Sequence, residues 1–291
     1  MAWQQLVFET DEAGAEPLEA LLEAAGAAAV SLEDSADQPL YEPPPGATPL
    51  WRATRVIALF EADHDVQSVL DELGTHYPNG LPHWRLEPLE EREWTRAWMD
   101  DYRPMRFGER LWIVPSWSAP PEPDAVNLLL DPGLAFGTGT HPTTRLCLEW
   151  LDAHPPRAAQ VLDYGCGSGI LAIAAALLGA AHVWAIDNDP QALIATRDNA
   201  ARNGVDAQIH AALPERMPAL ECDLLIANIL AGPLIDLAPQ LAPRVRAGGD
   251  LVLSGILPEQ AAEVAAAWQP WFDMDAPHAH EGWVRLAGRR R

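Results

Sequence analysis

The stretch Val161-Leu-Asp-Tyr-Gly-Cys-Gly-Ser-Gly-Ile-Leu171 leads from an apolar strand into a glycine-rich turn and on into a helix. Glycines let a backbone turn sharply and approach a ligand where a Cβ would clash. A dinucleotide-binding turn carries glycines at its first, third and sixth positions. Here Gly165 and Gly167 fill the first and third positions, but Ile170 stands at the sixth. The turn therefore disfavours a pyrophosphate, and a purely structural turn is the alternative.

An acid ends the next apolar strand, Val183-Trp-Ala-Ile-Asp187, eighteen positions after Gly169. A carboxylate in that place can accept hydrogen bonds from both ribose hydroxyls of a nucleoside. Asp163, just before the first glycine, can face the amino group of a ligand. S-adenosylmethionine, an adenosyl sulfonium, fits these elements better than NAD does. The alternative for Asp187 is a helix cap, a role that Asp189 can also fill.

Two more segments carry candidate site residues. Leu224-Leu-Ile-Ala-Asn228 ends in an amide that offers both an acceptor and a donor, and we expect Asn228 to orient the reacting group. A helix cap is its alternative role. The segment from Asp131 to Thr144 is rich in glycine and threonine, as ligand-carrying loops often are. His141 within it is either a base or a structural residue.

The order of predicted elements indicates two domains. Residues 1–89 follow the order strand, helix, strand, strand, helix, strand, the plan of a small ferredoxin-like α+β domain. Residues 90–108 are expected to form a connecting helix, with Trp94 and Trp98 on one face, and a linker. Residues 109–291 form the second domain, in which strands and helices alternate from Gln160 onward. That alternation predicts a parallel sheet covered on both faces, with ligands at the carboxyl ends of its strands.

The charge of the chain is strongly negative, with a formal net charge of -23. The first fifty residues contain ten Asp or Glu and no Lys or Arg. This excess of acidic residues argues against direct binding of nucleic acid and favours a basic partner. The alternative is that the acidic surface only keeps the protein soluble. The three cysteines lie too far apart for a metal knuckle, so no metal is expected. The chain has no apolar run of membrane-spanning length and no secretory signal at its start, which predicts a cytoplasmic protein.

Four segments, in this order and spacing, resemble the bacterial methyltransferases of ribosomal protein number eleven of the large subunit, the PrmA family. These segments are Phe136–Thr144, Asp163–Leu171, Ile186–Pro190 and Ala227–Pro233. The resemblance covers the chain from about Glu90 onward, while the first domain matches by length and plan only. It implies a seven-stranded Rossmann-like class I methyltransferase domain, 109–291, preceded by a substrate-recognition domain, 1–89. It also carries the family's cofactor contacts over to Thr144, Gly165, Asp187 and Asn228.

The activity implied by this resemblance is methylation of amino groups on that basic ribosomal protein, at lysine side chains and at the free amino terminus, from S-adenosylmethionine. Glutamine-amide methyltransferases place two prolines and an aromatic residue after the Asn, whereas Ile229 and Leu230 follow here. The alternatives are a methyltransferase for another protein or for a small-molecule amine, and a binding module that has lost activity. The complete set of glycine, acid and Asn elements argues against the last. The sequence leaves open the number and order of sites, any catalytic base and the oligomeric state.

Overall fold

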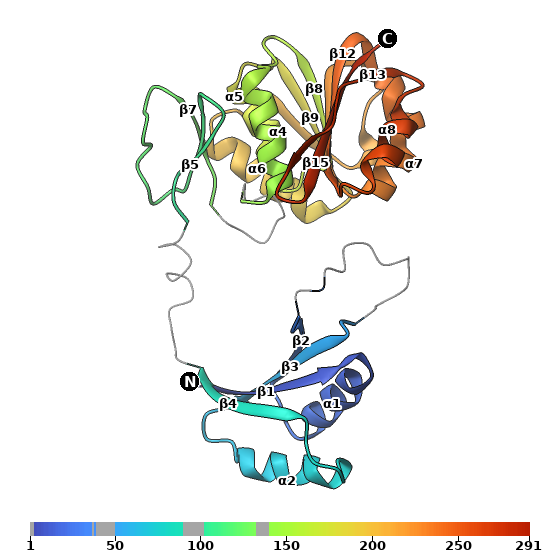
Figure 1. Ribbon diagram of the computed structural model, residues 1–291. Coiled ribbons are helices and arrows are strands. Elements are labelled where there is room, and N and C mark those ends of the chain that lie inside the picture. The colour runs from blue at the N-terminus through green and yellow to red at the C-terminus, as the bar shows by residue number, and fades with distance from the viewer. Residues whose placement is uncertain (1–2, 37, 39–49, 90–101, 132–139) are drawn as a thin grey trace. The chain divides into compact units, whose positions relative to one another are not determined.

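The structure, a computed structural model, describes residues 3–36, 38, 50–89, 102–131 and 140–291 (Figure 1). The chain divides into two compact units, Met1–Asp101 and Tyr102–Arg291. The expected connecting helix, with Trp94 and Trp98, lies outside the described residues. So do residues 132–139 of the glycine-rich and threonine-rich loop.

The first unit has the expected element order of strand, helix, strand, strand, helix, strand. Its sheet has the strand order β2-β3-β1-β4, and every pair in it is antiparallel. Successive residues of a strand point to opposite faces of its sheet. Alternate residues of β1 and β3, such as Phe8 and Val56, therefore share one face and pack with residues of both helices in one core. Asp11 and Asp65 cap the two helices. The elements are β1 Trp3–Asp11, α1 Glu12–Ala24, β2 Ala29–Asp34, β3 Ala53–Glu61, α2 Val66–His76 and β4 His83–Leu89.

A three-stranded sheet opens the second unit, with β5 Met105–Phe107 antiparallel to β6 Leu111–Val114, and β6 parallel to β7 Val126–Leu129. The sequence placed residues 105–107 in the linker, but their pairing with β6 makes them part of this unit. Asp152, which is buried, joins the sheet to the rest of the unit because its carboxylate accepts the backbone N–H of Glu109 at 2.7 Å.

The central sheet of the second unit has the order β10-β9-β8-β11-β12-β15-β13, and β14 also pairs with β15. Its elements are α4 Pro142–Ala153, β8 Gln160–Tyr164, α5 Ile170–Leu177, β9 His182–Ile186, α6 Pro190–Arg202, β10 Ile209–Ala212, β11 Cys222–Asn228, α7 Ala231–Leu241, β12 Val245–Ile256, α8 Ala261–Trp268, β13 Phe272–Met274, β14 His278–His280 and β15 Trp283–Arg290. Short 3₁₀ turns follow β10 and α7.

This sheet differs from the expected one in two ways. It is mixed rather than parallel, because β15 runs antiparallel to β12. It also has eight strands instead of seven. Both β13 and β14 pair with β15, at opposite ends of that strand, with Asp275–Pro277 between them. Pro277 has no N–H to donate to a ladder, which favours a break in an edge strand.

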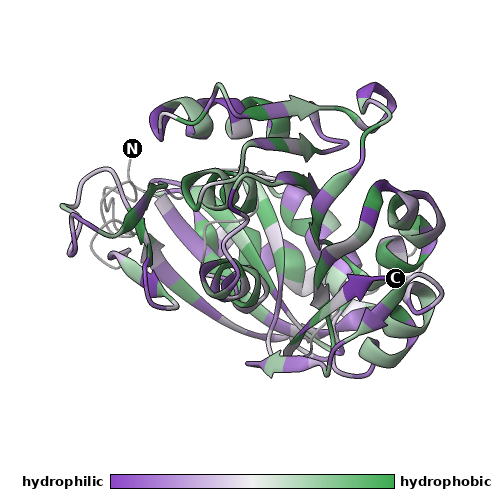
Figure 2. Cartoon of the chain, turned by 90° about the horizontal axis from the view of Figure 1, so that it is seen from above, coloured by the Kyte–Doolittle hydropathy of each residue, from purple (hydrophilic) through white to green (hydrophobic). Residues whose placement is uncertain are grey.

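Helices cover both faces of the central sheet (Figure 1). Val161 belongs to the apolar cluster that includes α4 and α5, whereas its neighbour Leu162 belongs to the cluster that includes α7 and α8. Figure 2 shows hydrophobic residues along the strands and on the helices that pack on them. The ends of the strands thus belong to a sheet that packs against helices on both of its faces.

Within the described ranges, no helix combines the length and the apolar character needed to cross a membrane. The same part of the chain contains no group of three or more His, Cys, Asp or Glu side chains that could hold a metal ion. The three thiols, Cys147, Cys166 and Cys222, are buried and free.

Candidate active site

The predicted site residues follow neighbouring parallel strands of the central sheet. Strand β8 pairs with β9 on one side and with β11 on the other. Because the carboxyl ends of parallel strands meet at one edge of a sheet, the glycine turn after β8, Asp187 after β9 and Asn228 at the end of β11 lie at the same edge. The structure therefore brings together the elements that the sequence singled out.

The glycine turn has a backbone that L-residues rarely adopt, with φ of +81° at Gly165, +53° at Gly167 and +80° at Gly169. A Cβ on Gly165 would lie 2.2 Å from Cγ2 of Ile229. The turn thus packs directly on the segment that follows β11. Gly169 is the N-cap of α5 and has no side chain to cap it. Because α5 begins directly after the turn, its amino end, which is the positive end of the helix dipole, lies at the same edge of the sheet.

Asp187 orders the turn through both carboxylate oxygens. Oδ2 accepts the N–H of Gly167 at 2.9 Å, and Oδ1 accepts the N–H of Asp189 at 3.0 Å. Asp189 caps α6 by accepting the N–H of Gln191 at 2.8 Å. The capping role that was the alternative for Asp187 therefore belongs to Asp189. Each oxygen of Asp187 keeps a further lone pair for a ligand hydroxyl.

Asp163 is fully buried beneath the turn. Its Oδ2 accepts the N–H of Ala172 at 3.0 Å, while Oδ1 has no hydrogen-bond partner among the described residues. Burial, and to a lesser degree the charge of Asp187, raises the pKa of Asp163 to about 7. An ammonium group near this carboxylate would favour its ionised form. Together, the unpartnered oxygen of Asp163, the glycine turn and the carboxylate of Asp187 fit one kind of ligand. That ligand is a nucleoside that carries a cationic amino acid.

Asn228 is joined to the first turn of α4. Its Nδ2 donates to Oγ1 of Thr144 at 3.4 Å, and Thr144 is fully buried. Helix α7 begins after Leu230 without a side-chain cap, so Asn228 is not a helix cap. Its amide oxygen is thus an acceptor at the carboxyl edge of the sheet.

His141 is the N-cap of α4. Its Nδ1 accepts the N–H of Thr143 at 3.3 Å and lies 2.7 Å from Oγ1 of the same residue. Burial lowers the pKa of His141. The imidazole therefore has the structural role that was one of its two expected alternatives, and its ring packs edge-on against Trp283.

The sequence did not single out the residues of α6 that hold the glycine turn from behind. Thr196 is fully buried and donates from Oγ1 to the carbonyl of Gly167 at 3.0 Å. Asn199 donates from Nδ2 to the carbonyl of Ser168 at 2.9 Å. The two side chains lie three positions apart, on one face of the helix. Two polar residues with this spacing, facing a glycine turn, are the signal that could have identified them.

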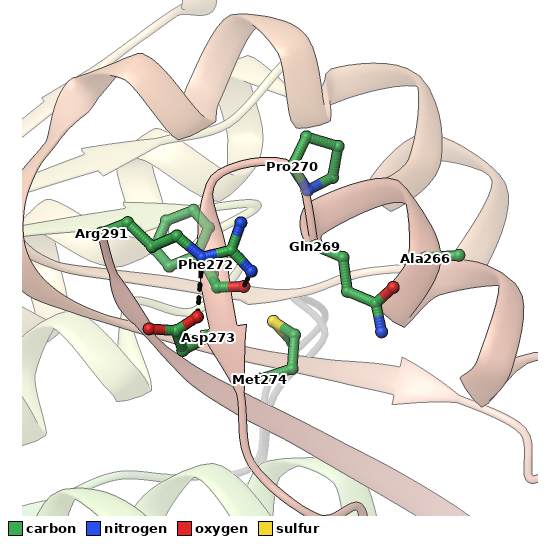
Figure 3. A pocket seen from close by; sticks show the side chains of 7 residues that line it. All are labelled: Ala266, Gln269, Pro270, Phe272, Asp273, Met274 and Arg291. Atoms are coloured by element: carbon green, nitrogen blue, oxygen red, sulfur yellow. Dashed lines mark hydrogen bonds and ion pairs between the residues drawn. The ribbon is translucent and has the colours of Figure 1, made fainter.

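A pocket of about 500 Å³ lies elsewhere in the second unit (Figure 3). Figure 3 shows Arg291 directed toward Asp273, and the two side chains are 2.7 Å apart. Arg289, near the carboxyl end of β15, lies opposite Asp250 of β12, and Asp250 lies beside Leu224, near the amino end of β11. The pocket therefore belongs to the end of the sheet opposite the glycine turn.

Comparisons with known proteins agree over nearly the whole chain. A family profile described as "Ribosomal protein L11 methyltransferase (PrmA)" matches residues 2–291. A Marinobacter nauticus protein named "Ribosomal protein L11 methyltransferase" is 56% identical over 296 residues, which cover 100% of this chain and 99% of its own. A protein of the same name from Pseudomonas aeruginosa is 56% identical over 292 residues, with coverage of 100% and 99%.

A solved structure is also similar, that of a ribosomal protein L11 methylase from Lactobacillus delbrueckii subsp. bulgaricus. The TM-score is 0.58 and the identity 36%, and the match covers 65% of this chain and 100% of the other. This likeness and the mixed central sheet support an α/β methyltransferase fold of the Rossmann-like kind.

Proposed function

This chain belongs to the ribosomal protein L11 methyltransferase family, and from that premise we propose that it methylates amino groups of ribosomal protein L11. The methyl donor is S-adenosylmethionine. The proposed acceptors are lysine side chains and the free α-amine, with up to three methyl groups on each. The observation that carries the proposal is the family match over residues 2–291. The glycine turn, Asp187 and Asn228 lie within that range and meet at one edge of the sheet.

We assign the donor to this edge. Asp187 would accept the ribose hydroxyls, and the backbone of Gly165 and Gly167 would line the nucleoside. The orphan oxygen of Asp163 would accept the ammonium of the methionine part, a contact supported by its burial and missing partner. Thr144 would set the position of Asn228 through their hydrogen bond. When bound, S-adenosylmethionine supplies a methyl group activated by a sulfonium.

The protein must hold the acceptor amine neutral, because only a free lone pair can attack. An ordinary lysine has a pKa near ~10.4, so holding it neutral at pH 7 costs about 4–5 kcal/mol, and an α-amine near ~8 costs much less. Removal of water from the site lowers this cost by disfavouring the ammonium form. The amide oxygen of Asn228 would accept an N–H of the amine and direct its lone pair. His141 is engaged in capping α4, so no strong general base is invoked.

The first unit would recognise the protein substrate. Its element order and its strand order β2-β3-β1-β4 support a ferredoxin-like domain. The sixteen acids and three arginines of residues 1–89 would attract a basic ribosomal protein. We place the reaction in the cytoplasm, where ribosomal proteins are made, with no metal and no direct contact to nucleic acid.

Labelling of lysates tests the choice of substrate. Extracts of cells with and without the gene for ribosomal protein L11 are incubated with the purified chain and radioactive donor. We expect one dominant labelled band at the size of that protein, absent from the second extract. A label that persists without the gene would assign the enzyme to another protein, and a label confined to the small-molecule fraction would assign it to a free amine. Donor binding with no transfer in any extract would leave only a binding module.

A further inference from the structure

Trp283 stands at the start of β15, immediately after a tight turn. Glu281 and Gly282 both have positive φ, +47° and +77°, and His280 pairs with Trp283 across the turn. Two central residues with φ above zero are the mark of the I′ turn that joins two-residue hairpins. This turn lies at the carboxyl edge of the sheet, since Val284 pairs with Ile256 at the end of β12. Trp283 is therefore at the same edge as the glycine turn.

Only one strand separates Trp283 from Asn228. Asn228 pairs with Ser254 of β12, and Oγ of Ser254 donates to the carbonyl of Val284 at 3.2 Å. Neighbouring strands are about 4.8 Å apart, so the backbones at Asn228 and at the start of β15 are on the order of 10 Å apart. An indole and an amide extending from these positions can border one small space.

The first turn of α4 contacts both residues. Thr144 accepts a hydrogen bond from Asn228, and the ring of His141 lies 4.9 Å from that of Trp283 at an interplanar angle of 64°. The hydrogen bonds between His141 and Thr143 fix the imidazole that the indole packs on. Trp283 is half-buried, so part of its surface remains accessible. One rigid turn thus sets the positions of Trp283 and Asn228 together.

We propose that the indole of Trp283 forms one wall of the site for the acceptor amine and attracts that amine as it becomes cationic; this rests on the proposed function. In each transfer the nitrogen lone pair forms a bond to the methyl carbon while the carbon–sulfur bond breaks, and sulfur keeps the electron pair. Positive charge therefore moves from sulfur to nitrogen, and a proton leaves to solvent before the next transfer. After the third transfer the charge is permanent. An aromatic face stabilises such a cation without competing for the lone pair of the neutral amine.

Calorimetry measures peptide binding to the full chain saturated with S-adenosylhomocysteine, and so tests the proposed role of Trp283 without methyl transfer. The two probes are short peptides with the amino-terminal sequence of ribosomal protein L11. One has a trimethylated α-amine, and the other has a neutral tert-butyl group of the same shape. We expect the unsubstituted protein to prefer the cationic peptide by roughly three- to thirtyfold, the range that a cation–π contact gives. Trp283→Leu should bind the two peptides equally, and Trp283→Phe should retain part of the preference.

The matched control is Trp184→Leu, which removes another half-buried indole; Trp184 belongs to β9 and packs on His210 of β10. It should keep the full preference. Mass spectrometry of methylated ribosomal protein should also show more mono- and dimethylated product with Trp283→Leu. Equal binding of both peptides by the unsubstituted protein, or an undiminished preference in the folded Phe and Leu variants, would overturn the proposal. A preference without any methylation of the ribosomal protein would instead contradict the proposed function.

Discussion

Substitution of Gly165 by alanine probes the contact between the glycine turn and β11. The added methyl group would occupy a backbone with φ of +81°, which costs an L-residue about 1–2 kcal/mol. It would also lie 2.2 Å from Cγ2 of Ile229, well inside ordinary contact. Overpacking of this kind costs about 1–3 kcal/mol. We therefore expect Gly165→Ala to lower the free energy of unfolding by about 2–5 kcal/mol in urea.

A control separates the backbone from the contact. Gly204 has φ of +67°, but a Cβ there meets no atom within 4 Å, so Gly204→Ala should cost only about 1–2 kcal/mol. Adding Ile229→Ala to Gly165→Ala removes the clashing methyl group and should return the cost of the glycine substitution to that of the control. Because Ile229 follows Asn228 directly, the single variant should also bind S-adenosylhomocysteine more weakly in calorimetry. A cost of Gly165→Ala no larger than that of Gly204→Ala, or no recovery of stability on adding Ile229→Ala, would contradict the predicted clash.

Three other outcomes follow from the same geometry. Asp187→Ala should weaken donor binding by about 1.5–3 kcal/mol in calorimetry, the cost of a lost charged hydrogen-bond partner. Asp189→Ala removes only the cap of α6 and should leave donor affinity nearly unchanged. Equal donor affinities in the two variants would contradict the contact between Asp187 and the ribose. The pKa of Asp163 is raised in the folded state to about 7, above its value of 3.8 in a free chain, so the native state holds this proton more tightly. The free energy of unfolding should therefore fall by at most about 4 kcal/mol as the pH rises from about 4 to about 7, and then level off. In urea titrations Asp163→Asn should lose this pH dependence. The same pH dependence in both proteins would contradict the raised pKa of Asp163. Removal of residues 1–89 should leave donor affinity nearly intact and abolish methylation of the intact ribosomal protein, and a truncated chain that methylates it at the full rate would refute the recognition role.

The parts of the site that the sequence predicted are those carried by local patterns. A strand that runs into glycines, as at Gly165, already requires a particular backbone, and an acid at the end of the next parallel strand must lie beside it. The proximity of Asp187 and Asn228 to the glycine turn could therefore be deduced before the structure was known. The element order of the first unit was likewise predictable from its apolar spacing.

The remaining features depend on tertiary packing. The direction of β15 is set by how the chain returns to β12, which no local pattern encodes. Strand β5 has only three residues, and its pairing with β6 rather than its composition makes it a strand. The hydrogen bond from Thr196 to the glycine turn depends on how α6 packs on α5. For His141, the sequence left two roles open, and only the geometry of its bonds to Thr143 identified the cap.

Mass spectrometry of purified ribosomal protein L11, after incubation with this chain and S-adenosylmethionine, tests the central claim most directly. We expect mass increments of whole methyl groups, up to three on each modified amine, located at lysine side chains and at the α-amine. A parallel sample with Asp187→Ala should show far less modification at the same donor concentration. An unmodified ribosomal protein, in the presence of an enzyme that binds the donor tightly, would contradict the account, as would methyl groups found on glutamine amides.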